Sequence, residues 1–108
     1  MAARLASICL MTLLTACGAF GSGANPRVSD AEYIAIARSS PPAQAFYAKY
    51  AGVDAQVDRS GRLAVDFRAA GARLRVFIEN DRVIDAFVEC PHGAMRIGNV
   101  IVAISACP

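Results

Sequence analysis

A cysteine, a histidine and a methionine lie close together near the end of the chain, in the stretch CPHGAM at 90–95. Their thiolate, imidazole and thioether groups are soft ligands of the kind that binds copper. His92 is the only histidine in the sequence, so one chain cannot supply a copper site with two histidines and one cysteine. A copper-handling site at His92 and Met95 is therefore the alternative to a simple loop with an exposed histidine.

The same region predicts a hairpin closed by a disulfide. If Gly-Asn at 98–99 forms a type II′ turn, Ile97 lies opposite Val100, and the same register places Cys90 opposite Cys107. The two cysteines then form a non-hydrogen-bonded pair, whose Cα atoms lie about 4.5 Å apart, near the lower end of the disulfide range. We therefore predict a Cys90–Cys107 bridge.

That register also supplies the only nucleophile and base that the sequence brings together. Ser105 falls opposite His92, and Glu89 is close by, but no strained turn motif surrounds the serine. Asp66 and Asp85 are predicted on separate strands, where they do not form the carboxylate pair of a glycosidase. The sequence also has no glycine-rich phosphate loop and no zinc-ligand spacing. We therefore expect a protein that is not an enzyme and has no cofactor.

The beginning of the chain has the pattern of a secretory signal. Arg4 precedes an apolar run over 5–14, which is too short to cross a bilayer that requires roughly 20 residues. The small residues Thr15 and Ala16 then stand directly before Cys17. This pattern favours a cleavable leader over the alternative, a short transmembrane or buried helix.

The motif Leu14-Thr15-Ala16-Cys17 resembles the lipobox of bacterial lipoproteins. The resemblance implies cleavage before Cys17 and a diacylglycerol thioether on its sulfur, usually with acylation of the new amino group. Two or three acyl chains make an essentially permanent membrane anchor. Gly18 stands where an aspartate retains such lipoproteins in the inner membrane. In a Gram-negative host the resemblance therefore implies the outer membrane, with the domain facing the periplasm.

The remaining sequence predicts one small domain behind a tether. We expect a signal peptide at 1–16, the lipidated cysteine and a Gly/Ser-rich spacer at 17–28, and an α+β domain at 29–108. A domain of this size buries only about 60% of the surface that its unfolded chain exposes, so a disulfide would help to stabilise it. The formal net charge is +2, and the arginines over 59–82 alternate with acidic residues. We therefore expect no nucleic-acid partner.

Two helices are predicted at the start of this domain. Ser29 and Glu32 match a capping box and predict a helix over about 30–39. Ser40-Pro41-Pro42 ends this helix and starts a second one, which Gly52 closes in the left-handed conformation. The second helix carries aromatic residues that we expect in a helix–sheet core, with a ligand platform as the alternative. These aromatic residues are Phe46, Tyr47 and Tyr50.

A period of two then predicts antiparallel strands. Strands over 53–58 and 62–68 flank a loop at 59–61, and strands over 73–79 and 82–89 flank a turn at 80–81. In this register Asp85 faces the core among apolar residues. A carboxylate in that position is expected either to lie near an edge or pair with an arginine, or to be a functional group. The predicted fold is α+β, with two N-terminal helices packed on an antiparallel β-meander of four to six strands.

The order of these elements resembles cystatin-like folds and small helix–helix–sheet lipoproteins of outer-membrane assembly, although no motif of either family is matched. The anchor, the small size and the missing catalytic set together favour a non-enzymatic binding module. We expect its partner to be an envelope protein or a cell-wall component. The sharper form of this expectation is that the chain itself is an inhibitor or immunity protein. Fold alone does not fix that function.

Overall fold

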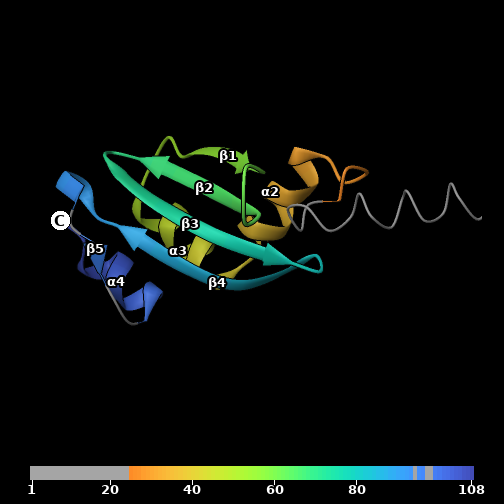
Figure 1. Cartoon of the computed structure of the whole chain (residues 1–108). Helices are drawn as coiled ribbons and strands as arrows, with labels where there is room; N and C mark the ends of the chain where they lie inside the picture. The colour runs from red at the N-terminus through yellow and green to blue at the C-terminus, as the bar shows by residue number, and fades with distance from the viewer. Residues whose placement is uncertain (1–24, 94, 97–98) are drawn as a thin grey trace, which may run out of the picture.

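A computed structural model describes residues 25–93, 95–96 and 99–108. These residues form helices and one antiparallel sheet, so the predicted α+β class is confirmed. Figure 1 shows their arrangement, with the sheet in front of the helix α3. In chain order the elements are α2 (Asp30–Arg38), α3 (Pro41–Lys49), β1 (Asp54–Asp58), β2 (Ala64–Ala69), β3 (Ala72–Glu79), β4 (Arg82–Glu89), a 3-10 turn η1 (Pro91–Gly93), β5 (Met95–Arg96) and α4 (Val100–Ala106).

Helix α2 begins where the sequence predicts. The amide of Glu32 donates to the Ser29 hydroxyl at 3.2 Å, and that hydroxyl donates to the Glu32 carboxylate. The carboxylate therefore binds the cap side chain rather than the cap amide, unlike a full capping box. Ser40 precedes α3 as expected, but its hydroxyl donates back to the carbonyl of Ala37. Gly52 has the predicted positive φ of 65°, just after α3.

The sheet has the order β1-β2-β3-β4-β5, so each strand pairs with its neighbour in the chain. One face of the sheet shares a core with the helices. Tyr33 of α2 and Phe46 of α3 are almost completely buried in this core, together with Phe67 of β2 and Leu74 of β3. Tyr47 is half-buried, and its ring meets that of Phe67 edge-on at 5.7 Å. The aromatic residues of α3 therefore pack against the sheet.

Tight turns set the register of the central hairpins. The two-residue turn predicted at Asn80-Asp81 is confirmed, and Ala70-Gly71 forms a second one. All four residues have positive φ, between 51° and 81°, as a type I′ turn requires. The predicted loop at 59–61 is too short, because Asp58 pairs with Ala64 and the connection spans 59–63.

A β-bulge overturns the predicted position of Asp85. Ile78 pairs with Val83, but Phe77 pairs with Asp85, so Ile84 is an extra residue without a partner in β3. An extra residue inverts the inward and outward positions beyond it. Asp85 is therefore exposed on the face away from the core, and the apolar side chain of Val88 is buried instead.

The predicted C-terminal hairpin is wrong, although its disulfide is present. Residues 100–106 form helix α4, and the Asn99 side chain caps it by accepting from the amides of Ile101 and Val102. Cys90 and Cys107 are bonded with their Cα atoms 5.3 Å apart, rather than at the shorter cross-strand spacing. The bridge therefore joins the end of β4 to the end of a helix.

Lys49 holds the other side of the same helix end. Its ammonium donates to the carbonyl oxygens of Ile104 at 2.7 Å and Ser105 at 3.2 Å, and to that of Cys107. The last carbonyls of a helix lack partners within the helix, and a cation there is also favoured by the helix dipole. One lysine of α3 thus caps α4 beside the disulfide.

The two type I′ turns supply a matched pair of stability tests. Ala70 and Asn80 occupy the first central position of their turns with nearly equal φ, 51° and 52°. Asparagine tolerates this conformation better than alanine does. We expect Ala70→Asn to raise the free energy of unfolding by about 0.5–1 kcal/mol, and Asn80→Ala to lower it similarly. Urea unfolding of both variants checks this; changes of the same sign would contradict the turn assignment.

Candidate functional site

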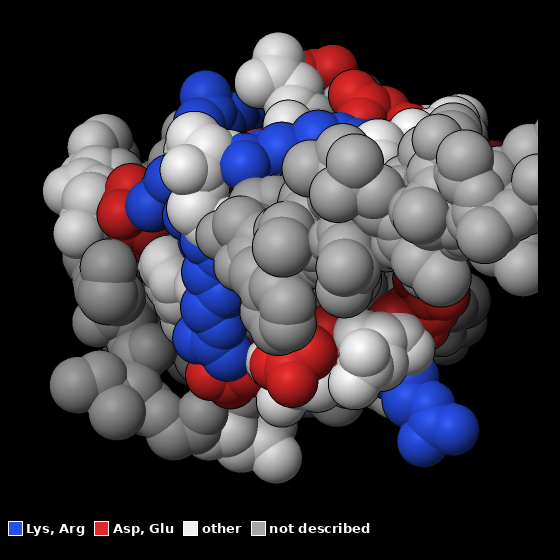
Figure 2. All heavy atoms as spheres, turned by 45° about the vertical axis from the view of Figure 1, so that its right-hand side comes forward, with Lys and Arg blue, Asp and Glu red and all other residues white. Residues whose placement is uncertain are grey.

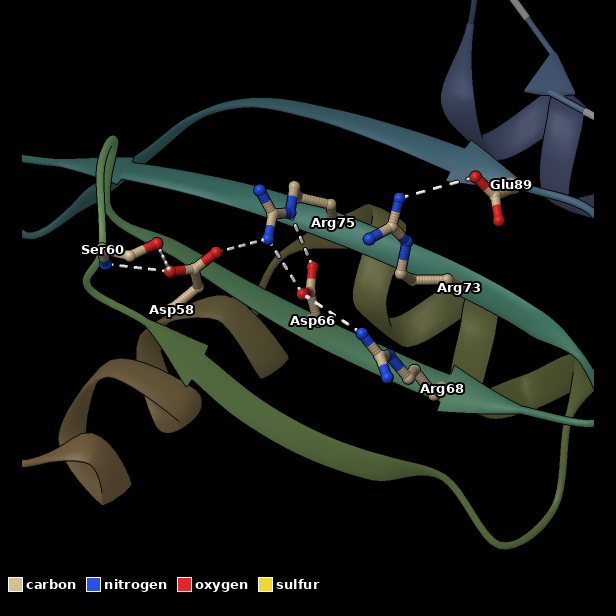
Figure 3. Close-up of polar contacts among 7 residues, drawn as sticks. All are labelled: Asp58, Ser60, Asp66, Arg68, Arg73, Arg75 and Glu89. Carbon is tan, nitrogen blue, oxygen red and sulfur yellow. Dashed lines mark hydrogen bonds and ion pairs between the residues drawn. The ribbon is translucent and has the colours of Figure 1, made fainter. Parts of the chain in front are cut away.

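We define the outer face of the sheet as the face turned away from α2 and α3. Among the described residues, it carries the network of ion pairs that joins neighbouring strands. Figure 3 shows its charged side chains in front of the sheet and the helices behind it. The strand register determines which residues share this face. They are Asp54, Gln56 and Asp58 of β1; Ala64, Asp66 and Arg68 of β2; Arg73, Arg75, Phe77 and Glu79 of β3; and Arg82, Asp85, Phe87 and Glu89 of β4.

Arg75 is the centre of the polar contacts on this face. Its Nε and Nη2 atoms donate to the two carboxylate oxygens of Asp66 at 2.8 and 3.0 Å. Nη2 also donates to Asp58 at 2.7 Å, so one guanidinium joins β1, β2 and β3 (Figure 3). Asp66 is only 6% exposed, and the bidentate contact with Arg75 compensates the cost of burying its carboxylate. The hydrogen bonds with Asp66 raise the pKa of Arg75 above the ordinary value of an arginine.

Asp58 is held by the loop that follows it. The hydroxyl and the backbone amide of Ser60 both donate to its Oδ1, at 2.6 and 2.9 Å. These hydrogen bonds, with the Arg75 contact as a smaller cause, lower the pKa of Asp58 to about 2. A carboxylate that accepts several donors stays ionised and is a poor proton donor or base near neutral pH. Asp58 is therefore suited to holding the loop and the sheet together.

Arg68 and Arg73 are paired more loosely. Arg68 lies 4.0 Å from Asp66, whose oxygens already bind Arg75, and Arg73 makes one 3.5 Å contact with Glu89. Both arginines and Glu89 line an open hollow beside the β2–β3 turn, whose other lining residues are at 69–72. This end of the outer face therefore has guanidinium groups with weak partners and space beside them.

Aromatic rings occupy the other part of the face. Phe77 and Phe87 lie with their ring centres 6.0 Å apart. The Arg62 guanidinium lies over Phe77 at 4.3 Å, and Arg73 lies 5.8 Å from Phe87. Such cation–π contacts are favourable and cover the rings partly. The face is thus a layer of arginines, carboxylates and rings held in place by one another.

Charges of both signs alternate on the surface as well. Figure 2 shows basic and acidic side chains next to one another on the described part of the visible surface. The outer face can present hydrogen-bond donors and acceptors in fixed positions, because they stand on strands rather than on loops. Its least exposed carboxylate, Asp66, and the carboxylate of Asp58 are both bound by Arg75.

Among the described side chains, those that the sequence singled out as candidate site residues do not form one site. Cys17 lies outside the described residues. His92 is exposed in η1 with a φ of 69°, and the sulfur of Cys90 is bound in the disulfide. Met95 begins β5, and its side chain is not described. The prediction that placed Ser105 opposite His92 is wrong, because it used a hairpin register where the chain forms a helix.

Sequence reasoning missed the pairing of Asp66, which it treated as a lone carboxylate. The signal was available in part: with a two-residue turn at 70–71, Asp66 falls opposite Arg75. Both residues also belong to the polar set of an alternating strand. The third member, Asp58, depends on the length of the 59–63 loop, which the sequence did not give.

Comparisons of this chain with protein-family models, with curated proteins and with solved structures find no match. Among residues 25–93, 95–96 and 99–108, no helix has the length and apolar character of a membrane span. The same part of the chain holds no cluster of three or more His, Cys, Asp or Glu side chains that could bind a metal ion.

The Arg75–Asp66 pair can be tested by a double-mutant cycle. Arg75→Gln leaves a buried carboxylate without its main partner, so we expect the free energy of unfolding to fall by about 2–4 kcal/mol. Asp66→Asn should cost less, and the double variant should cost less than the sum of the two. Urea unfolding measures all three, with the exposed Arg82→Gln as control. An Arg75→Gln variant as stable as Arg82→Gln would contradict the pairing.

Asp58 predicts a specific dependence of stability on pH. Its folded pKa of about 2 lies below the ordinary value of 3.8. The carboxylate therefore stabilises the fold above pH 3.8, and this contribution disappears as the pH falls towards 2. We expect Asp58→Asn to flatten the stability profile over that window. Asp54→Asn, at the other end of β1, should keep the wild-type slope; equal flattening in both variants would refute the assignment.

Proposed function

We propose that this chain is a lipid-anchored envelope lipoprotein that acts as a non-enzymatic binding module. Its signal peptide occupies 1–16, its lipidated tether 17–28, and its domain 29–108, with two N-terminal helices packed on one face of an antiparallel meander. The lipobox-like motif before Cys17 supports the anchor. The Cys90–Cys107 disulfide supports an exported domain, because such bonds persist in oxidising compartments.

The proposed location follows from the residue after the anchor. Gly18 takes the place of the aspartate that keeps bacterial lipoproteins in the inner membrane. In a Gram-negative host the protein therefore resides in the outer membrane and faces the periplasm. The spacer up to residue 28 lets the domain reach partners near the membrane.

One observation carries the binding function: the outer face of the sheet stays outside the core and carries charged groups in fixed positions. The buried side chains of α2, α3 and α4 all enter the core. Arg75 of β3 binds Asp66 of β2 and Asp58 of β1, so the three strands that present this face are held together and little conformational entropy is lost when a partner docks. The partner is an envelope protein or a cell-wall component, and the sharper form of the proposal is a periplasmic inhibitor or immunity protein.

The anchor is tested by changing the cysteine that would carry it. We expect Cys17→Ser to move the protein from the membrane fraction to the soluble periplasmic fraction or to leave it unprocessed. Cys9→Ser, within the leader, should leave the anchoring unchanged. Mass spectrometry of the native protein should find a diacylglycerol thioether at Cys17. An intact leader or an unmodified Cys17 thiol would refute the lipoprotein assignment.

The binding face is tested by crosslinking in living cells. A photo-reactive amino acid replaces Gln56, which is exposed on the outer face, or Gln44, which is exposed on α3. We expect one discrete adduct from position 56 that depends on Cys17, and none from position 44. Adducts of the same size from both positions, or none from position 56, would contradict recognition through this face.

A further inference from the structure

We propose that Arg68 and Arg73 form a binding site for the carboxylate group of a peptide ligand. This inference deepens the proposed function, and the peptide nature of the ligand rests on it. The first observation is the strand register: Arg68 of β2 and Arg73 of β3 are directly opposite on the outer face. Like charges at opposed positions destabilise a sheet unless something neutralises them.

The neutralisation that the protein itself supplies is incomplete. Asp66 binds Arg75 through both oxygens at 2.8 and 3.0 Å, which leaves Arg68 at 4.0 Å from the same carboxylate. The Arg68 side chain is 56% exposed, and Figure 3 shows its guanidinium turned towards Asp66 rather than towards Arg73. Arg68 can therefore change partner without breaking a short contact.

Arg73 has donors left over. Its one contact with Glu89 is 3.5 Å long, at the outer limit of a hydrogen bond. Its Nε is buried and has no hydrogen-bond partner among the described residues. A buried polar group without a partner costs free energy. A ligand carboxylate that accepts a hydrogen bond from this Nε would remove that cost, which favours binding.

The space for a ligand lies between these side chains. Both arginines and Glu89 line the hollow at the β2–β3 turn, and residues 69–72 of its lining are alanine or glycine. Small side chains leave the guanidinium groups accessible from the end of the sheet. A side chain at Gly71 would be strained, because the residue has a φ of 81°.

The charge of the hollow selects the ligand class. Within the lining of the hollow, two guanidinium groups and the Glu89 carboxylate leave one positive charge, which one carboxylate neutralises. Asp66 is already bound by Arg75, and the exposed Asp54, opposite Arg68 in β1, is a competing carboxylate from outside the hollow. A phosphate monoester, which carries nearly two negative charges at neutral pH, would be repelled more strongly by Glu89. Guanidinium groups also match the planar geometry of a carboxylate with paired hydrogen bonds. An acidic side chain or a C-terminus of a peptide fits these requirements.

The test uses the full-length protein in a non-ionic detergent and follows backbone amide signals by NMR. The probe is the blocked peptide acetyl-Gly-Asp-Gly-amide, with acetyl-Gly-Asn-Gly-amide as its uncharged match and inorganic phosphate as the competing class. We expect saturable shifts at residues 68–73 and 89 with the aspartate peptide and none with the asparagine peptide. Phosphate should bind more weakly.

Variants assign the site. Arg68→Gln and Arg73→Gln should each weaken binding of the aspartate peptide by about tenfold or more, since each removes a charge-assisted hydrogen bond. Arg82→Gln, at the far end of β4, should leave it unchanged. Glu89→Gln should tighten binding by about two- to fivefold, because it removes the competing carboxylate. A gain of affinity cannot come from misfolding, so this variant tests the site even where Arg73→Gln disturbs the sheet.

Two results would overturn the site. One is the absence of saturable shifts with the aspartate peptide, and the other is an equal response of the Arg68→Gln, Arg73→Gln and Arg82→Gln variants. Phosphate that binds more tightly than the peptide would overturn the ligand class. The outcome is separable from the proposed function: a Gln56 adduct in cells without peptide binding in vitro would reject only this site. Peptide binding without any adduct would reject only the envelope partner.

Discussion

One extra residue in β4 determines the two faces of the sheet. Because Ile84 has no partner in β3, the alternation of β4 is inverted from Asp85 onward. This inversion places Val88 and Cys90 in the core. It also places Asp85, Phe87 and Glu89 on the outer face. Without the bulge, Glu89 would not meet Arg73, and Cys90 would point away from the helix that carries Cys107.

The inward cysteine is what fastens the end of the chain. Helix α4 is only seven residues long, and an isolated helix of that length is not stable in water. It is held by Ala103 and Ile104 in the core, by the disulfide at Cys107, and by the ammonium of Lys49 on its last carbonyls. The small domain thus gains a third helix through covalent and charged contacts rather than through a larger core.

The outer face changes character from one end to the other. At one end Arg75 binds Asp58 and Asp66 through short contacts that leave little for a ligand. At the other end, Arg68 and Arg73 face each other beside an open hollow with longer contacts. The tightly paired end fixes the strands, and the loosely paired end keeps its donors. This division suits a binding module, in which a rigid support presents a few groups that can exchange partners.

The sequence by itself determined the local features: the Ser29 cap, the turn at Asn80-Asp81 and the α+β class. These depend mainly on side chains within a few residues of one another. The predicted pairing of Cys90 with Cys107 is present in the structure, but the hairpin register that predicted it is not. Tertiary structure alone decided that 100–106 is a helix and that Asp85 faces solvent. The spacing of Val100, Ala103, Ile104 and Cys107 is helical, but β-branched residues fit a strand equally well until α3 offers a surface to pack on. A bulge likewise has no local signature here, because its free energy comes from which side chains the finished core can bury.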